Sequence, residues 1–164
     1  MIAVSFGPAT SVLAAAGDGA SSNIQLFDTD NNGIIDQITF DIANPNGETW
    51  SLNGASPYGL SATQGGSALT ISSVTIPGSV TANPVTVQVD LSETGMTTDT
   101  DGVNANAIEL SYTQAGYGAT PNIQDSVDEE LNPIASGDTG ATDTEIDAAP
   151  PIIIGLEYYD SGSD

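Results

Sequence analysis

The sequence predicts an all-β protein, built as an antiparallel β-sandwich with extended terminal strands. Short runs in which apolar and polar residues alternate recur along the chain, as in strands that bury one face. Loops rich in Gly, Asn, Ser and Thr separate these runs, and no segment has a convincing helical period. Several short strands joined by turns, without a long helix, are typical of two packed antiparallel sheets.

The first strands are expected in residues 22–27 and 34–43, where apolar side chains fall on every second position. The Asn-Pro-Asn-Gly sequence at residues 44–47 predicts a turn. Residues 48–52, with Trp50 in phase, are expected to return as the second arm of a hairpin.

Three further strands are expected downstream. Residues 68–77 form one of them, and a doubled serine within it shifts the alternation and predicts a β-bulge. Residues 85–91 show the cleanest alternation in the chain, and residues 105–113 carry another regular pattern. Residues 125–131 could form one helical turn at most.

The chain divides into three parts by composition. Residues 1–19 read as an N-terminal strand and arm, and not as a signal peptide, because they lack a basic segment and a Gly-Pro pair interrupts them. Residues 20–149 form the predicted sandwich and end in a polar stretch, at 138–149, that suggests a linker. Residues 150–164 begin with the most hydrophobic and β-prone run of the protein.

The charge composition restricts the function. The 164 residues include 15 Asp and 7 Glu but no Lys, Arg, His or Cys, and the formal net charge is −22. Without cationic side chains the protein has nothing with which to bind nucleic acid or an anionic membrane surface. It also lacks a His or Lys base for a Ser or Thr nucleophile and the His or Cys ligands of zinc sites, and no spacing among its acids selects a catalytic carboxylate pair. The sequence therefore predicts a protein without enzymatic activity.

One acidic loop has the ligand spacing that Ca²⁺ prefers. Oxygen donors fall at loop positions 1, 3, 5 and 9, a Gly at position 6 allows the sharp turn, and position 7 offers a backbone carbonyl. The predicted ligands are Asp28, Asp30, Asn32, Ile34 and Asp36. Position 12 is Thr39 and not the Glu of an EF-hand, so one strong ligand is missing unless a carboxylate from elsewhere supplies it. The alternative is a plain Asx-rich turn.

Other acidic segments are weaker candidates. Asp99, Asp101 and Asn104 form a shorter loop that could be a second Ca²⁺ site or a solvated turn. Asp160 and Asp164 would supply half a site that a neighbouring molecule completes. The acids between residues 125 and 130 are expected to form a solvated face.

Residues 156–164 repeat the pattern of residues 24–32: apolar, polar, apolar, aromatic, Asp, and then a small polar run closed by Asp or Asn. The acidic loop at residues 28–36, together with this repeat, resembles the opening of the immunoglobulin-like repeats of large prokaryotic surface proteins. The resemblance is loose over most of the chain, and only the acidic loop is specific. It implies an immunoglobulin-like sandwich, an extracellular or cell-surface location, and an array-forming or filament-forming module without enzymatic activity.

The resemblance implies that the C-terminal run is the first strand of an unfinished second domain. A strand so hydrophobic must either fold back onto its own domain or add to an open edge of another copy, which is donor-strand exchange. The residues expected to carry this assembly are Pro151, Ile152, Ile153, Ile154, Leu156, Tyr158 and Tyr159. Repeated head to tail, such an exchange makes an open polymer of the chain with itself.

A carbohydrate-binding or adhesin module from a tandem-repeat surface protein is the alternative. Such a module would use exposed aromatic rings as platforms for sugars. The candidate rings are Trp50, Tyr58, Tyr112, Tyr117, Tyr158 and Tyr159. Aromatic residues make up only 5% of the chain and several are in phase with core faces, so most are expected in the core or in an interface.

Overall fold

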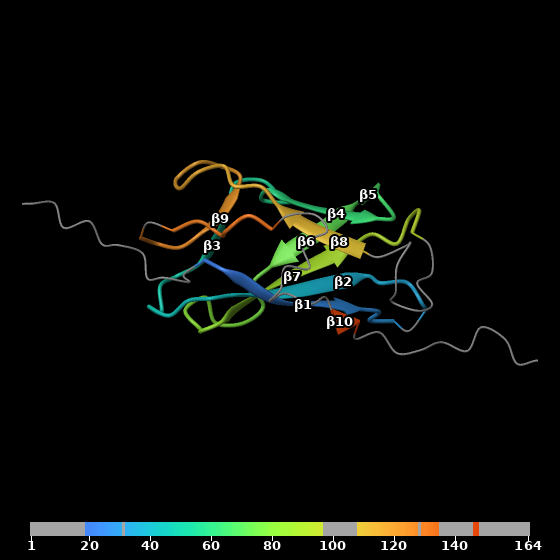
Figure 1. The fold of residues 1–164 in the computed structure, drawn as a ribbon, viewed down its shortest axis with the longest axis horizontal. Helices are drawn as coiled ribbons and strands as arrows, with labels where there is room; N and C mark the ends of the chain where they lie inside the picture. The colour runs from blue at the N-terminus through green and yellow to red at the C-terminus, as the bar shows by residue number, and fades with distance from the viewer. Residues whose placement is uncertain (1–18, 31, 97–107, 128, 135–145, 148–164) are drawn as a thin grey trace, which may run out of the picture.

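The computed structural model describes residues 19–30, 32–96, 108–127, 129–134 and 146–147, and every regular element among them is a β-strand. Figure 1 shows how the strands are arranged. They are β1 (Ser21–Phe27), β2 (Gln37–Ile42), β3 (Ser51–Asn53), β4 (Leu60–Gln64), β5 (Ser67–Leu69), β6 (Ile71–Thr75), β7 (Val85–Leu91), β8 (Ile108–Tyr112), β9 (Asn122–Gln124) and β10 (Ile146–Asp147). Among these residues no helix is long and apolar enough to cross a membrane.

The largest sheet has the strand order β10-β1-β2-β7-β6. All its neighbouring strands are antiparallel except β10, which pairs in parallel with β1. On the two central strands every second side chain is buried, because alternate side chains of a strand point to the same face. The side chains of β2 and β7 with no exposed surface are Ile38, Phe40, Ile42, Val85, Val87 and Val89.

Two smaller antiparallel sheets complete the fold, with strand orders β5-β4-β8 and β3-β9. Gly65 and Gly66 join β4 to β5, and their φ angles of 55° and 80° suit the two-residue turns that match strand twist. The buried side chains of all three sheets form one hydrophobic cluster. Trp50, which is 1% exposed, lies in that cluster directly before β3.

Two predicted elements were wrong. Residues 48–52 do not form a hairpin with β2. Instead, β3 pairs with β9, and the backbone N–H of Trp50 donates to the Val80 carbonyl at 3.0 Å. Residues 68–77 are not one strand, because β5 and β6 belong to different sheets. The bulge predicted there is confirmed as a register shift between Ile71 and Ser73 against β7. The sequence also gave no sign of β4, β9 or β10.

A buried tyrosine–glutamate pair connects β8 to the loops that follow it. The Tyr112 hydroxyl donates to Glu130 Oε1 at 2.7 Å and accepts the Ile123 N–H at 3.1 Å. The Glu130 carboxylate also accepts the backbone N–H groups of Ala115 and Gly116 at 2.8 and 2.7 Å. Backbone and hydroxyl donors thus solvate a buried carboxylate in a chain that has no basic side chain to pair with it.

Replacing Tyr112 with Phe should lower the free energy of unfolding by about 1–3 kcal/mol, because the buried Ile123 N–H loses the hydroxyl that accepts it and Glu130 loses one of its three donors. Burial, opposed by the Ile123 N–H and reinforced by Glu130, raises the pKa of Tyr112 above its ordinary value of 10.0. The pKa of Tyr112 is higher in the folded chain than in the unfolded chain. The stability that this difference contributes is complete below about pH 10 and is lost as the pH rises toward the folded-state pKa. Denaturant unfolding at about pH 8, below that window, and at about pH 11, within it, measures this loss.

The Tyr112→Phe chain is expected to lack this alkaline loss of stability. Tyr117→Phe is the matched control, because Tyr117 is 45% exposed and its replacement should leave the pH dependence unchanged. An identical alkaline loss in Tyr112→Phe and in the unaltered chain would contradict the prediction.

Candidate metal centre

The acidic loop connects β1 to β2 and is closed by its own backbone. The Asp36 N–H donates to the Phe27 carbonyl at 3.0 Å across the base of the loop. Asp28 is buried, and its carboxylate accepts the N–H of Asn32 at 3.1 Å and that of Gly33 at 2.7 Å. Gly33 has a φ of 88°, a left-handed conformation that a glycine adopts without strain. The sequence pattern Asp-x-x-x-Asn-Gly therefore shapes the loop before any ligand is considered.

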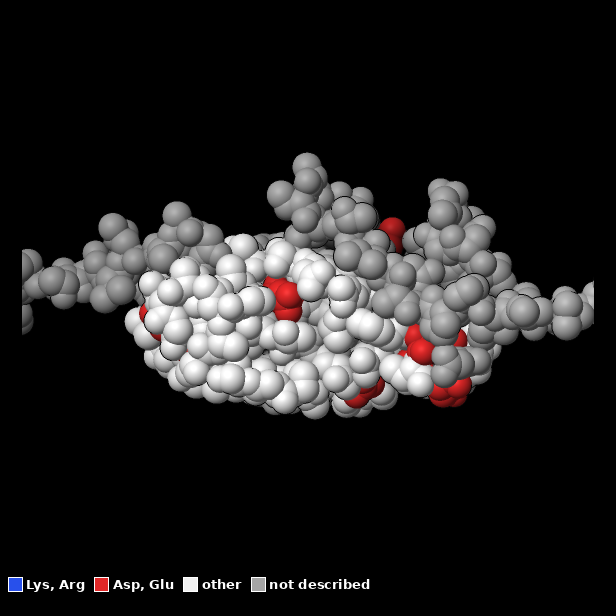
Figure 2. Space-filling view, turned by 90° about the horizontal axis from the view of Figure 1, so that it is seen from below, with Lys and Arg blue, Asp and Glu red and all other residues white. Residues whose placement is uncertain are grey.

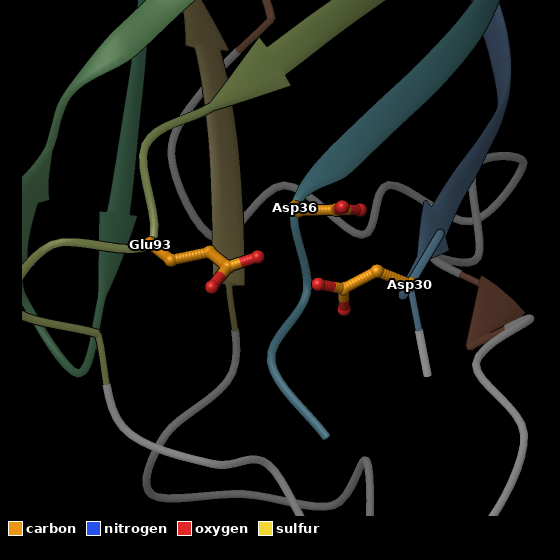
Figure 3. Close-up of side chains that lie close together, drawn as sticks. All are labelled: Asp30, Asp36 and Glu93. Atoms are coloured by element: carbon orange, nitrogen blue, oxygen red, sulfur yellow. The ribbon is translucent and has the colours of Figure 1, made fainter. Parts of the chain in front are cut away.

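Three carboxylates converge beside this loop. Asp30 and Asp36 belong to the loop, and Glu93 comes from the segment that follows β7 (Figure 3). Each offers one carboxylate oxygen, and these oxygens all lie within 4.8 Å of one another. Ca²⁺ binds oxygens at about 2.3–2.6 Å, so ligands of one ion lie up to about 5 Å apart. The acidic cluster formed by Asp30, Asp36 and Glu93 could therefore hold a metal ion.

Glu93 is the member of the acidic cluster that the sequence did not identify. The β2–β7 pairing opposes Gln37 to Asp90, and the Leu91 N–H donates to the Asp36 carbonyl at 2.8 Å. This pairing carries the chain after β7 past the acidic loop and brings Glu93 to it. The loop spacing lacked one strong ligand, and this carboxylate from a distant segment could supply it. No local signal could have revealed it, because it depends on which strand pairs with β2.

Hydrogen bonds to amide and hydroxyl donors hold the cluster. Asp36 accepts the Thr29 N–H at 2.9 Å and the Thr29 hydroxyl. The Asn32 side-chain amide donates to Asp30 Oδ2 at 3.2 Å and to Glu93 Oε2 at 3.0 Å. The positive end of the amide dipole thus lies between two carboxylates. A cation in that place would be attracted more strongly than the amide, because it carries a full charge and not a partial one. A bound metal ion would compete with this amide.

The predicted ligands have different places in the structure. Asp30 and Asp36 lie in the acidic cluster, whereas Asp28 caps the loop and the Ile34 N–H donates to Asn32 Oδ1 at 2.8 Å. The other predicted site and assembly residues lie outside the described residues: Asp99, Asp101, Asn104, Asp160, Asp164, Pro151, Ile152, Ile153, Ile154, Leu156, Tyr158 and Tyr159.

Two of the acids between residues 125 and 130 are not part of the solvated face that was expected, and Asp128 lies outside the described residues. Asp125 is 1% exposed and Glu130 is 5% exposed. Asp125 Oδ1 accepts the N–H groups of Val127 and Glu129, both at 2.9 Å, and thereby caps a tight turn. Backbone N–H groups take the place of solvent around these two carboxylates. A sequence pattern does not show such donors, so it could not predict this burial.

The aromatic candidates for sugar binding are mostly covered. Trp50 and Tyr112 are buried in the core and Tyr58 is half-buried against it, which leaves Tyr117 as the exposed ring among the described candidates. Tyr158 and Tyr159 lie outside the described residues. A sugar-binding platform of several adjacent rings is therefore not formed by the described candidates.

The described face in Figure 2 carries few acidic side chains, and several of them gather toward one end of the molecule. Known proteins provide no assignment for this arrangement. No family model, no curated protein and no solved structure matches the chain.

Proposed function

We propose that this chain is a structural subunit of an extracellular filament or surface array, without enzymatic activity. In this proposal the three sheets form an immunoglobulin-like β-sandwich. Residues 151–159 of each subunit add as a strand to the next subunit, and Ca²⁺ bound at the acidic cluster braces the junction. Antiparallel sheets that share one hydrophobic core, with alternate burial along β2, β7 and β8, support the sandwich.

The parallel pairing of β10 with β1 carries the proposal. The described chain begins at Gly19, just before β1, whereas β10 pairs with Gln25 and Leu26 near the far end of that strand. At about 3.3 Å per residue the two positions are roughly 20 Å apart along one strand direction. The C-terminal segment therefore starts at the end of the domain opposite to Gly19. A strand donated from this end to another copy makes a heterologous contact, which repeats as an open head-to-tail array unless the rotation between subunits closes a ring.

Calcium is the cation that best suits the acidic cluster. The chain contains no His or Cys, so its side chains offer a metal mainly oxygen ligands. Three carboxylates leave several positions of a six- to eight-coordinate ion to backbone carbonyls, water or a neighbouring subunit. The acidic loop directly follows β1 at the end where β10 pairs, which puts the cluster beside the proposed junction. Ca²⁺ there would screen the repulsion between two highly acidic subunits.

Electron microscopy of the purified chain, with Ca²⁺ and again after a chelator, tests the proposal. Ordered fibres that fray or dissolve on chelation are the expected result. Monodisperse particles in both conditions would contradict the filament and favour a calcium-dependent carbohydrate-binding or adhesin module of a tandem-repeat surface protein. The exposure of the Tyr117 ring is the observation that supports this second candidate.

A further inference from the structure

A long central part of the chain carries no ionisable acid. Residues 49–89 contain no Asp or Glu, although the whole chain has 22 of them. This charge-free segment (residues 49–89) forms β3, β4, β5, β6 and β7 up to Val89. Two identical subunits with a net charge of −22 and no basic side chain repel each other, and they cannot form salt bridges between side chains. Contact between copies is therefore least unfavourable where this segment reaches the surface.

The charge-free segment includes a sheet edge with no strand beside it among the described residues. β6 is the outermost strand of the five-stranded sheet, at the edge opposite to β10. Natural edge strands are often protected by Lys, Pro or inward-pointing charges, and β6 has none of these. Its inward side is apolar, with Val74 buried and with Ile71 and Ile76 half-buried against the core. An incoming apolar strand could cover these side chains and satisfy the backbone groups of the edge.

The acid on the neighbouring strand does not disturb this edge. Asp90 of β7 accepts hydrogen bonds from the side chains of Ser73, Gln88 and Gln37. Burial raises the pKa of Asp90, but these three hydrogen bonds outweigh burial and hold the pKa below its ordinary value. The charge of this carboxylate is thus already compensated by neighbouring polar groups, and β6 does not have to accommodate it.

The chain's own C-terminal strand cannot reach this edge. Four strand spacings separate β10 from β6, and a strand added outside β6 would lie about 24 Å from β10. From Asp147 to Pro151 the chain spans at most about 14 Å even when fully extended. A strand that begins at Pro151 therefore cannot start beside the β6 edge of its own molecule, and it can pair with such an edge only in a different molecule.

We propose that the β6 edge of one subunit accepts residues 151–159 of a second copy of this chain. This inference rests on the proposed function and adds the acceptor surface to it. The donor strand matches that surface, because Ile152, Ile154 and Leu156 alternate on one face and no acid occurs from Ala148 to Leu156. The uncharged part of the donor, residues 151–156, then meets an uncharged edge, and Glu157 falls on the outward face of the strand.

Introduced cysteines test the pairing cleanly, because the full chain contains none. Thr75→Cys places a thiol on the outward, exposed side of β6. It is combined in turn with Ile153→Cys, Gly155→Cys or Glu157→Cys, the outward positions of the donor strand. Opposed side chains across two strands approach closely enough for a disulfide in at least one of these registers. Oxidation of the assembled protein should then give a ladder of covalent oligomers on a non-reducing gel.

Ser22→Cys, combined with the same donor positions, is the matched control. Ser22 is exposed on β1, which lies toward the other edge of the same sheet. Ladders from Ser22→Cys but not from Thr75→Cys would overturn the β6 assignment and leave donor-strand polymerisation standing. A cross-linked monomer, or fibres without any ladder, would also overturn it. Absence of fibres in the reduced single variants and in the unaltered chain would sink the proposed function itself.

Discussion

Deleting residues 150–164 should abolish the proposed assembly while the β-sheets and their common core stay folded. The deletion removes the hydrophobic donor strand but no described residue of the core. It also removes Glu157, Asp160 and Asp164, so the truncated chain carries less negative charge and its subunits repel one another less. Loss of assembly could then not be attributed to repulsion. Sedimentation and electron microscopy measure assembly, and far-ultraviolet circular dichroism measures the fold.

Single substitutions in the full chain give a matched pair for the same prediction. Ile154→Asp puts a charge on the face of the strand that also carries Ile152 and Leu156, whereas Ile153→Asp puts it on the face that carries Glu157. Both add one charge, but only the first charge has to be buried on assembly. Loss of the buried side chain alone should raise the critical concentration about 100-fold for Ile154→Asp, with little change for Ile153→Asp. Fibres from the truncated chain, or equal effects of the two variants, would exclude this donor strand.

Calcium should stabilise the folded chain through Glu93. With a dissociation constant on the order of 10⁻⁴ M, as in weak extracellular sites, about 10 mM Ca²⁺ should add roughly 2.7 kcal/mol to the free energy of unfolding. For a domain of this size that corresponds to a rise in Tm of roughly 5–10 °C. Glu93→Gln should lose most of this rise, because it removes one of the three converging carboxylates. Thermal unfolding with Ca²⁺ and with a chelator measures both values.

The same substitution should have the opposite effect without metal. Three carboxylate oxygens within 4.8 Å repel one another, so Glu93→Gln is expected to raise Tm slightly in the presence of a chelator. Gln retains an oxygen that can accept the hydrogen bond from the Asn32 amide. Glu109→Gln on β8 removes one charge outside the cluster and should leave the response to Ca²⁺ intact. If both variants respond to Ca²⁺ alike, the acidic cluster is not the binding site.

The absence of basic side chains explains several features together. Buried carboxylates such as Glu130 are held by hydroxyl and backbone donors, and Asp90 is held by side-chain donors. At the acidic cluster the Asn32 side-chain amide donates to both Asp30 and Glu93, and the Asn32 backbone N–H also donates to Asp30. An added cation would compensate the three converging carboxylates further.

The sequence by itself determined the all-β class and the faces of the regular strands. Residues 85–91 and 108–112 alternate so strictly that one register alone buries their apolar side chains, and a slip of one residue would expose them all. It also determined the acidic loop, because the spacing of Asp28, Asn32 and Gly33 lets side-chain oxygens and a left-handed glycine close the turn locally.

Only the tertiary structure decided which strands pair and which residues meet. The sequence pattern from Ala68 to Thr75 looks like one strand, yet a crossing between sheets divides it at Thr70. Glu93 reaches the acidic loop because β7 pairs with β2, and β10 lies beside β1 although its sequence resembles a linker. Strand pairing joins distant segments through backbone hydrogen bonds that almost any side chain permits, so a local pattern carries little information about it.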